Sequence, residues 1–283
     1  VTVVGPLNNQ FLTLCTLPNS ITSIGERAFQ YAIELTSIDL PAGVTSIGQA
    51  AFMDCRKLTN ITIPASVTRI EDSAFTRCNK LTSINIPANV TYIGRRAFEN
   101  CYELESVSIG KNVAKIYSDA FNGCYKLTQF SIHEDIRDID YQWFKNTAYY
   151  NNSDNWENGV LYIDNHLIKA KDSVSGKYEI KDGTKSIGVK AFEKCFKLTE
   201  VTMPEGFKRI SNNAFNYCYS LESIKMPSSL MYIGVEAFLK CIRLNNVTIP
   251  DNVTRIHDSV FFDCWNLESV TLSKRIMVIG NSA

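Results

Sequence analysis

Nine cysteines and three histidines are the side chains in this sequence best suited to bind a metal or to act as nucleophile and base. Eight of the cysteines recur at one fixed step in two series: Cys55, Cys78, Cys101, Cys124, Cys195, Cys218, Cys241 and Cys264. A zinc site needs cysteines in close pairs such as C-x₂-C, because several thiolates must converge on one ion. The sequence contains no such pair. We therefore expect no metal and no cofactor.

Disulfides between these cysteines are also disfavoured. Equivalent residues of stacked repeats would have Cα atoms about 5 Å apart, which is inside the disulfide range, but their side chains would point the same way. The count is odd, and Cys15 occupies an inward strand position instead. Ala32 and Thr147 hold the cysteine place in two further repeats. The position therefore selects small size, and we expect buried free thiols that pack as small hydrophobic groups.

The histidines do not indicate a catalytic site. His257 stands at a predicted corner, His166 in a predicted hairpin, and His133 where a strand-ending proline is usual. None of them recurs with a Ser or Cys partner, and the sequence has no G-x-G-x-x-G, P-loop or H-E-x-x-H motif. We predict no catalytic residues and no enzymatic activity. An enzyme with a site assembled across repeats near 141–170 stays an alternative, because motif analysis would not detect it.

Charge and hydropathy exclude two classes of partner. Lys+Arg and Asp+Glu both number 29, so no net charge attracts nucleic acid or an anionic membrane. No apolar run approaches the roughly 18 residues of a membrane span, so we expect no membrane insertion by this segment. The chain begins with Val1; we interpret it as trimmed, so the missing leader says nothing about compartment.

Phenylalanine recurs every 23 residues over most of the chain. The first series is Phe29, Phe52, Phe75, Phe98, Phe121 and Phe144, and the second is Phe192, Phe215, Phe238 and Phe261. The step of 48 residues between the two series is two periods plus two residues. A fixed period of 20–50 residues indicates a solenoid, in which each repeat is one coil and buries its apolar side chains only against its neighbours.

The residues of one repeat predict a coil made of three short segments, which we call the first, second and third legs. Apolar residues alternate through 81–86, which predicts a strand, and Pro87 marks its end because proline lacks a ladder donor. Apolar residues in 90–93 predict a second extended stretch, and 97–101 has the apolar spacing of a short helical or 3₁₀ turn. Equivalent strands of successive coils would pair in parallel about 4.8 Å apart.

The unit L-x-x-I-x-I-P-x-x-V-x-x-I-G-x-x-A-F-x-x-C resembles the BspA-like (treponemal-type) class of leucine-rich repeats over nearly the whole chain. The resemblance implies a right-handed solenoid on secreted or cell-surface proteins of host-associated microbes, linked to adhesion and protein binding. Ordinary leucine-rich repeats place an inward Asn after the strand. Here valines stand near that place, so we expect a more apolar interior: Val44, Val67, Val90, Val113 and Val253.

The predicted fold is an α/β leucine-rich-repeat solenoid of about eleven 23-residue coils, with parallel strands, short extended or 3₁₀ legs and one β-hairpin insertion. We predict a single domain, 1–283, with an N-terminal repeat block 12–146, an irregular insert 147–174 and a C-terminal block 175–283. The last coil stops one residue before its Phe. Either a further segment follows, or this coil pairs end to end with another chain.

The insert carries the hairpin and a cluster of aromatic residues. "VLYIDNHLIKA" reads as two apolar runs joined by Asp164-Asn165. Two alternatives stay open for the aromatic residues: they plug a gap between two repeat blocks, which we favour, or they form a ligand patch on the irregular segment. The candidate patch is Trp143, Tyr149, Tyr150 and Trp156.

Two regular surfaces are candidate binding sites. The outward side of the first strand carries short hydroxyls and amides that could bind protein backbone or sugar, or could simply be solvated: Ser83, Asn85, Ser106, Ser108, Ser223, Lys225, Asn246 and Thr248. The residue after each cysteine forms an aromatic stripe, which either shields a corner or, if exposed, is an interface: Tyr102, Tyr125, Phe196, Tyr219 and Trp265.

The sequence favours a secreted or cell-surface interaction and adhesion module that binds a host or matrix protein or a glycan through a repeat face. This prediction is based on an unbroken repeat that carries no recognisable catalytic or metal-binding motif. The alternative is a structural stalk that presents a neighbouring domain.

Overall fold

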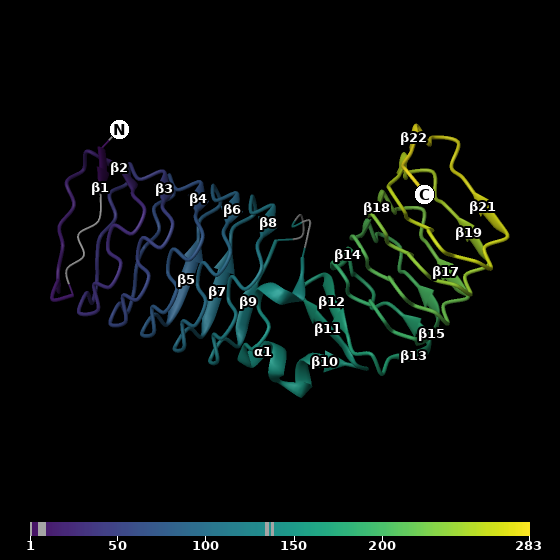
Figure 1. Cartoon of the computed structure of the whole chain (residues 1–283), viewed down its shortest axis with the longest axis horizontal. Helices are drawn as coiled ribbons and strands as arrows, with labels where there is room; N and C mark the ends of the chain where they lie inside the picture. Colours follow the sequence, from purple (N-terminus) through teal and green to yellow (C-terminus); the bar gives the residue numbers. More distant parts are fainter. Residues whose placement is uncertain (1, 5–9, 134–135, 137–138) are drawn as a thin grey trace. The chain divides into compact units, whose positions relative to one another are not determined.

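The computed structural model describes residues 2–4, 10–133, 136 and 139–283. The chain divides into two compact units, the first of residues 1–137 and 142–153 and the second of 138–141 and 154–283. Each is described by itself (Figure 1). The boundary at 153/154 falls inside the predicted insert, whereas residues 138–141 of the predicted N-terminal block group with the second unit. The grouping of all coils into one domain stays a prediction.

From residue 81 onward the first leg of the regular coils is the predicted strand, and these strands form short parallel sheets, whereas the same leg at 35–40 and 58–63 is not a strand, contrary to the prediction. Their register advances by one repeat, as Ser83 pairs with Ser106 and Ile86 with Ile109. In the first unit the order is β5 (Ser83–Ile86), β7 (Ser106–Ile109) and β9 (Gln129–Ser131). In the second unit it is β13 (Ser175–Glu179), β15 (Lys197–Thr202) and β17 (Ser223–Lys225), then β19 (Asn246–Thr248) with β21 (Ser269–Thr271).

The second leg forms longer sheets of very short strands (Figure 1). In the first unit the order is β1 (Thr2–Val4), β2 (Ile21–Ile24), β3 (Ser46–Ile47), β4 (Arg69–Ile70), β6 (Tyr92–Ile93) and β8 (Lys115–Ile116). In the second it is β10 (Trp156–Glu157), β11 (Val160–Ile163), β12 (His166–Ala170), β14 (Ser186–Ile187), β16 (Arg209–Ile210) and β18 (Tyr232–Ile233), then β20 (Arg255–Ile256) with β22 (Val278–Ile279). The prediction of a parallel-strand solenoid of about eleven coils is confirmed.

The third leg is a series of single turns that bonds to the next coil. Ala97 N–H donates to Gly94 O at 3.4 Å, an i to i−3 bond, while Phe98 N–H donates to Ala120 O at 2.7 Å in the next coil. Arg96 and Asn100 have φ of 57° and 59°, and the same two places have positive φ in nearly every coil. These left-handed residues interrupt any helix and turn alternate N–H groups toward the neighbouring coil.

The phenylalanines form a column in the core of each unit. Phe75 and Phe98 have ring centroids 5.1 Å apart at 5°, and Phe98 and Phe121 5.1 Å apart at 1°. The second unit repeats this from Phe192 to Phe261. The predicted contact between consecutive coils is therefore confirmed. Phe144 leaves the column despite its spacing, because its coil is irregular; it packs on Trp143, Phe130 and Tyr150 instead.

The cysteines are free, as predicted, but they do more than fill space. Each Sγ in the regular coils lies near the carbonyl oxygen of the phenylalanine in the preceding coil, at 3.2 Å for Cys55 and Phe29. The contact recurs at Cys78, Cys101, Cys124, Cys218, Cys241 and Cys264. Cys195 follows the irregular coil and instead reaches Lys171 O at 3.7 Å. Since each thiol donates to a main-chain carbonyl of the preceding coil, the column of cysteines links successive coils.

A second link joins some of the coils at the corner after the second leg. Asp72 Oδ1 accepts from Arg95 N–H of the next coil at 2.8 Å. Gly94 leaves room for that carboxylate, since a Cβ at Gly94 would lie 2.5 Å from Asp72 Oδ1. Asn212 with Gly234, and Asp258 with Gly280, repeat the arrangement. The Gly of the repeat is therefore required by the close approach of the coil before it, both of its main chain and, where Asp or Asn is present, of that side chain.

The insert contains the predicted hairpin and two features that were not predicted. β11 and β12 pair antiparallel, with Ile163 opposite His166 across the Asp164-Asn165 turn. An additional strand, β10, pairs with β11 through Asn158-Gly159, where φ is 52° and 80°, as a type I′ turn requires. The few helical segments are η1 (Tyr141–Trp143), α1 (Ala148–Asn151) and η2 (Ser153–Asn155). None of the helices in the described part of the chain is long and apolar enough to cross a bilayer.

Candidate functional site

The outward faces of the first-leg strands are open and polar. All eight predicted residues of this face are exposed or half-exposed. In the first unit they line a shallow groove of about 570 Å³ that crosses β5, β7 and β9 and ends at Tyr149. Ser83, Asn85, Ser106 and Ser108 all border it. The groove offers hydroxyl and amide groups to a ligand, and the half-buried Phe130 and Tyr149 give it an apolar surface as well.

The second unit has a corresponding groove whose lining, unlike that of the first, includes charged side chains, Lys225 and Asp251. It measures about 630 Å³ and includes Lys225, Asn246 and Thr248 among its lining. Glu200, on the same face, lies between Lys177 and Lys225, each with Nζ 2.9 Å from a carboxylate oxygen. The hydrogen bonds from Lys225 and Lys177 lower the pKa of the Glu200 carboxyl. Ser223 is half-exposed on β17 beside this network.

The aromatic stripe is exposed rather than hidden under a corner. Its five members have exposed fractions of 39% (Tyr102), 60% (Tyr125), 45% (Phe196), 39% (Tyr219) and 76% (Trp265). The first two rings stack at 5.6 Å and 7°. The third and fourth stack at 5.2 Å and 18°. The shielding alternative is thus disfavoured, while an interface role stays a prediction.

The insert residues do not form one accessible patch. Trp143 is fully buried, with its ring 5.9 Å from Phe121 and 5.4 Å from Phe130. It closes the end of the phenylalanine column within the first unit and must be removed from the candidate ligand patch. Tyr149 and Tyr150 are half-buried around Phe144 in the first unit. Trp156 belongs to the second unit, where the Lys171 Nζ lies 4.9 Å from its ring centroid.

A Ser–His pair exists that the sequence did not indicate. His166 Nδ1 lies 2.7 Å from Ser186 Oγ, because β12 and β14 pair these two residues directly. Both side chains are buried, at 0% and 4% exposed, so no substrate reaches them. Within the described residues, no group of three or more His, Cys, Asp or Glu side chains could hold a metal ion.

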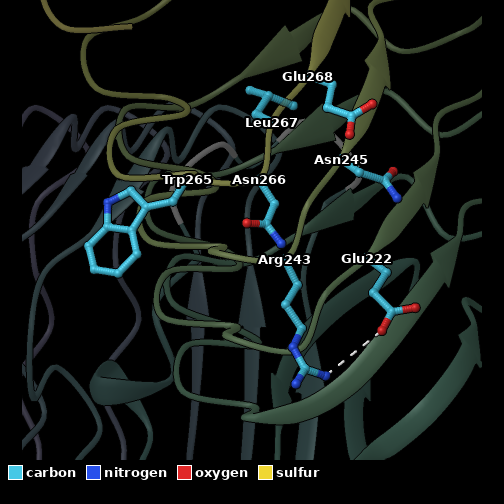
Figure 2. A pocket seen from close by; sticks show the side chains of 7 residues that line it. All are labelled: Glu222, Arg243, Asn245, Trp265, Asn266, Leu267 and Glu268. Carbon is cyan, nitrogen blue, oxygen red and sulfur yellow. Dashed lines mark ion pairs between the residues drawn. The ribbon is translucent and has the colours of Figure 1, made fainter.

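A hollow beside Trp265 was also missed. It measures about 690 Å³ and lies where the third leg turns into the strand of the next coil. Figure 2 shows Trp265 at one side and Glu222, Asn245 and Glu268 at the other, with Arg243 extended toward Glu222. Only Trp265 belonged to the predicted sites. The signal was the pair of charged or amide residues two and four places after Cys241 and after Cys264, which was not considered beside the stripe.

The repeat decides the family. The model described as BspA type leucine rich repeat region matches with six copies, over residues 7–128, 45–175 and 162–283. This chain belongs to the BspA-type leucine-rich repeat family. Nothing among the curated proteins matches this BspA-type protein.

Several solved structures are similar to the BspA-type protein. A leucine rich cell surface protein of Faecalibacterium prausnitzii is 25% identical with a TM-score of 0.39, over 96% of this chain and 79% of that chain. The T. pallidum leucine rich repeat protein TpLRR is 21% identical with a TM-score of 0.43, over 86% and 82%. The pneumococcal vaccine antigen PcpA is 22% identical with a TM-score of 0.43, over 99% and 78%.

Proposed function

We propose that this protein is a non-catalytic interaction and adhesion module, secreted or held at a cell surface, that binds a protein or glycan of a host or matrix surface through its repeat faces. The observation that carries the proposal is the open groove across β5, β7 and β9, where short hydroxyl and amide side chains border the aromatic residues Phe130 and Tyr149. The location is taken from the family resemblance and is part of the proposal.

The exposed aromatic stripe supports the same function. Pairs of stacked rings on the surface, such as Tyr102 with Tyr125, offer contact area at low conformational-entropy cost. The absence of catalysis is likewise a proposal, and it is supported by a solenoid whose interior is filled by apolar columns.

A survey of binding tests the proposal. The full chain is immobilised and exposed to extracellular matrix proteins and to solubilised host cell-surface material, and bound partners are measured by surface plasmon resonance. We expect saturable binding that weakens at least about tenfold in Tyr102→Ser/Tyr125→Ser or in variants of the strand face. No binding to any of this material would overturn the proposal. The stalk alternative predicts that neither set of variants changes the function of the full-length protein.

A further inference from the structure

A buried carboxylate brings two arginines together in the first unit. Asp54 is fully buried in a third-leg turn, where its φ is 61°. Arg56 donates from Nε to Asp54 Oδ1 at 3.0 Å, and its Nη2 lies 2.9 Å from the same oxygen. Arg77 belongs to the next coil, and its Nη1 lies 3.4 Å from the other oxygen, Oδ2. Two guanidinium groups from successive coils therefore meet on one carboxylate.

The two arginines serve Asp54 unequally. A buried carboxylate needs a partner, and Arg56 supplies one by hydrogen-bonding to Oδ1. Oδ2 makes no hydrogen bond to any residue that the structure describes, so Arg77 is held near it by charge alone. The Arg77 guanidinium likewise makes no hydrogen bond within the described residues. Its N–H groups are therefore free to bind another acceptor.

Both arginine side chains reach solvent. Arg56 is 56% exposed and Arg77 43%, against 0% for the Asp54 side chain. The carboxylate is thus covered, while the arginines that lie on it have unused N–H groups accessible from outside. The cluster carries one net positive charge, because two guanidinium groups share a single carboxylate.

The repeat does not require this cluster. One coil further on, beyond Arg77, the places of Asp54 and Arg56 are held by Asn100 and Tyr102. Asp263 is the equivalent carboxylate in the second unit, where no arginine follows two places on, and it is only half-buried. The pair of arginines is therefore particular to this site.

We propose that Arg56 and Arg77 bind a sulfate ester of a sulfated glycan, with its terminal oxygens shared between the two guanidinium groups. The planar guanidinium fork matches the oxygens of tetrahedral oxyanions. A sulfate ester carries one negative charge and three terminal oxygens, which match the single net charge and the two forks of the cluster. The inference rests on the proposed interaction function and names one ligand class and one site for it.

Other oxyanions match the cluster less well. A carboxylate has two oxygens, which a single guanidinium fork already satisfies. A phosphate monoester carries about −1.5 to −2 charges at neutral pH, and the cluster supplies only one positive charge to balance them. The chain as a whole has no net charge, so a polyanion is not attracted to it without a local site of this kind.

Binding to defined polyanions tests the ligand class. The full chain is passed over immobilised heparin, chemically desulfated heparin, hyaluronan and polyphosphate at physiological ionic strength, and affinities are measured by surface plasmon resonance. Hyaluronan has carboxylates and no sulfate. We expect saturable binding to heparin, and binding at least about tenfold weaker to desulfated heparin and to hyaluronan. Tighter binding to polyphosphate than to heparin would assign the site to phosphate and overturn the inference.

Three variants test the site. Arg77→Gln leaves Arg56 on Asp54, and we expect it to weaken heparin binding at least about fivefold. Arg56→Lys keeps a cation on the carboxylate but removes the fork, and it should weaken binding to a similar degree. Arg96→Gln is the matched control, because Arg96 also has positive φ (57°), is 62% exposed and pairs alone with Glu99 at 3.8 Å. It should change the affinity by less than about twofold.

Folding is checked by urea midpoints. That of Arg77→Gln should stay close to wild type, because an exposed arginine in a long ion pair contributes little to stability. The inference is overturned if heparin does not bind, if desulfated heparin binds as tightly, or if Arg96→Gln weakens binding as much as Arg77→Gln does.

A second arm separates this inference from the proposed function. Host cell-surface material is treated with heparin lyases and chondroitinase before binding of the full chain is measured. Loss of binding after this treatment supports the sulfated-glycan site. Full binding after the treatment that is still lost in Ser83→Arg/Ser108→Arg leaves the interaction function standing and overturns the sulfate inference.

Discussion

The thiol of Cys101 lies 3.2 Å from the main-chain carbonyl oxygen of Phe75, which belongs to the coil before its own. This contact joins the two residue types that define the repeat. The valines that stand near the inward asparagine place of ordinary leucine-rich repeats are buried, as expected, and the hydrogen bonds between side chain and main chain come from the cysteine place instead. The cysteine column is therefore part of the coil-to-coil bonding and not only a filler of small volume.

Removal of one thiol should cost a hydrogen bond and leave a small cavity. We predict that Cys101→Ala lowers the free energy of unfolding by about 1–3 kcal/mol in urea denaturation. Cys15→Ala is the control, because Cys15 is only half-buried and lies outside the column. Equal effects of the two substitutions would contradict the role assigned to the Cys101 contact.

Thiol reactivity should follow burial. We predict that a dithiobisbenzoate reagent labels Cys15 first and the half-buried Cys264 more slowly, since burial raises the pKa of the Cys264 thiol to about 12, while the other seven cysteines are buried. The seven should react only as the chain unfolds, because the attacking species is the thiolate and burial suppresses it. Rapid labelling of more than two thiols in native buffer would count against the stacked cores.

Stability should fall at alkaline pH. Burial raises the pKa of Cys55 to about 12, and those of Cys195 and Cys264 also to about 12, against 9.0 for a free thiol. The folded chain thus keeps protons that the unfolded chain loses, so the stabilisation is complete below pH 9 and is lost as pH rises from 9 toward 12.

The measurement is the urea midpoint between pH 8 and 10.5. Each thiol that stays protonated in the folded state should contribute a loss of about 1.4 kcal/mol per pH unit above 9. Burial also raises the pKa of Cys78 well above its usual value, so Cys78→Ala should show a shallower decline than wild type. An identical decline in the two proteins would exclude the Cys78 thiol as a source of the pH dependence.

The glycine at the second corner should be sterically irreplaceable. A Cβ at Gly94 would lie 2.5 Å from the main-chain nitrogen of Asp72. We predict that Gly94→Ala costs more than about 2 kcal/mol, because the backbone of the previous coil must shift. Gly183→Ala is the comparison, since φ is +82° there but nothing lies within 4 Å of the added Cβ. It should cost only about 1 kcal/mol of backbone strain. Unfolding midpoints that place Gly183→Ala below Gly94→Ala would contradict the clash.

The 23-residue period was enough to predict which side chains stack. Phe75, Phe98 and Phe121 meet as expected, because a coil of fixed length places equivalent residues over one another. The first and second legs were likewise predictable from apolar alternation and from Pro87.

The third leg was not predictable from residue type. Tyr31, Arg77 and Lys240 have φ of 62°, 62° and 59°, although none of these residues favours the left-handed region. The strain at each is offset by an inter-coil bond such as Arg77 N–H to Glu99 O at 2.8 Å. The Asp72–Gly94 pairing was missed for a similar reason, since it joins residues of different repeats and is invisible within one repeat. The Trp265 hollow also draws on three coils at once.

Binding through the strand face is the central claim, and one matched pair of variants tests it most directly. Ser83→Arg/Ser108→Arg places two bulky charges in the groove across β5 and β7, while Ala65→Arg/Ala88→Arg places the same charges on exposed residues at the corner after the strand. The affinity of the full chain for host cell-surface material is measured by surface plasmon resonance. The account predicts at least about a tenfold loss for the groove variant and none for the corner variant. Equal affinity in the two variants would contradict it.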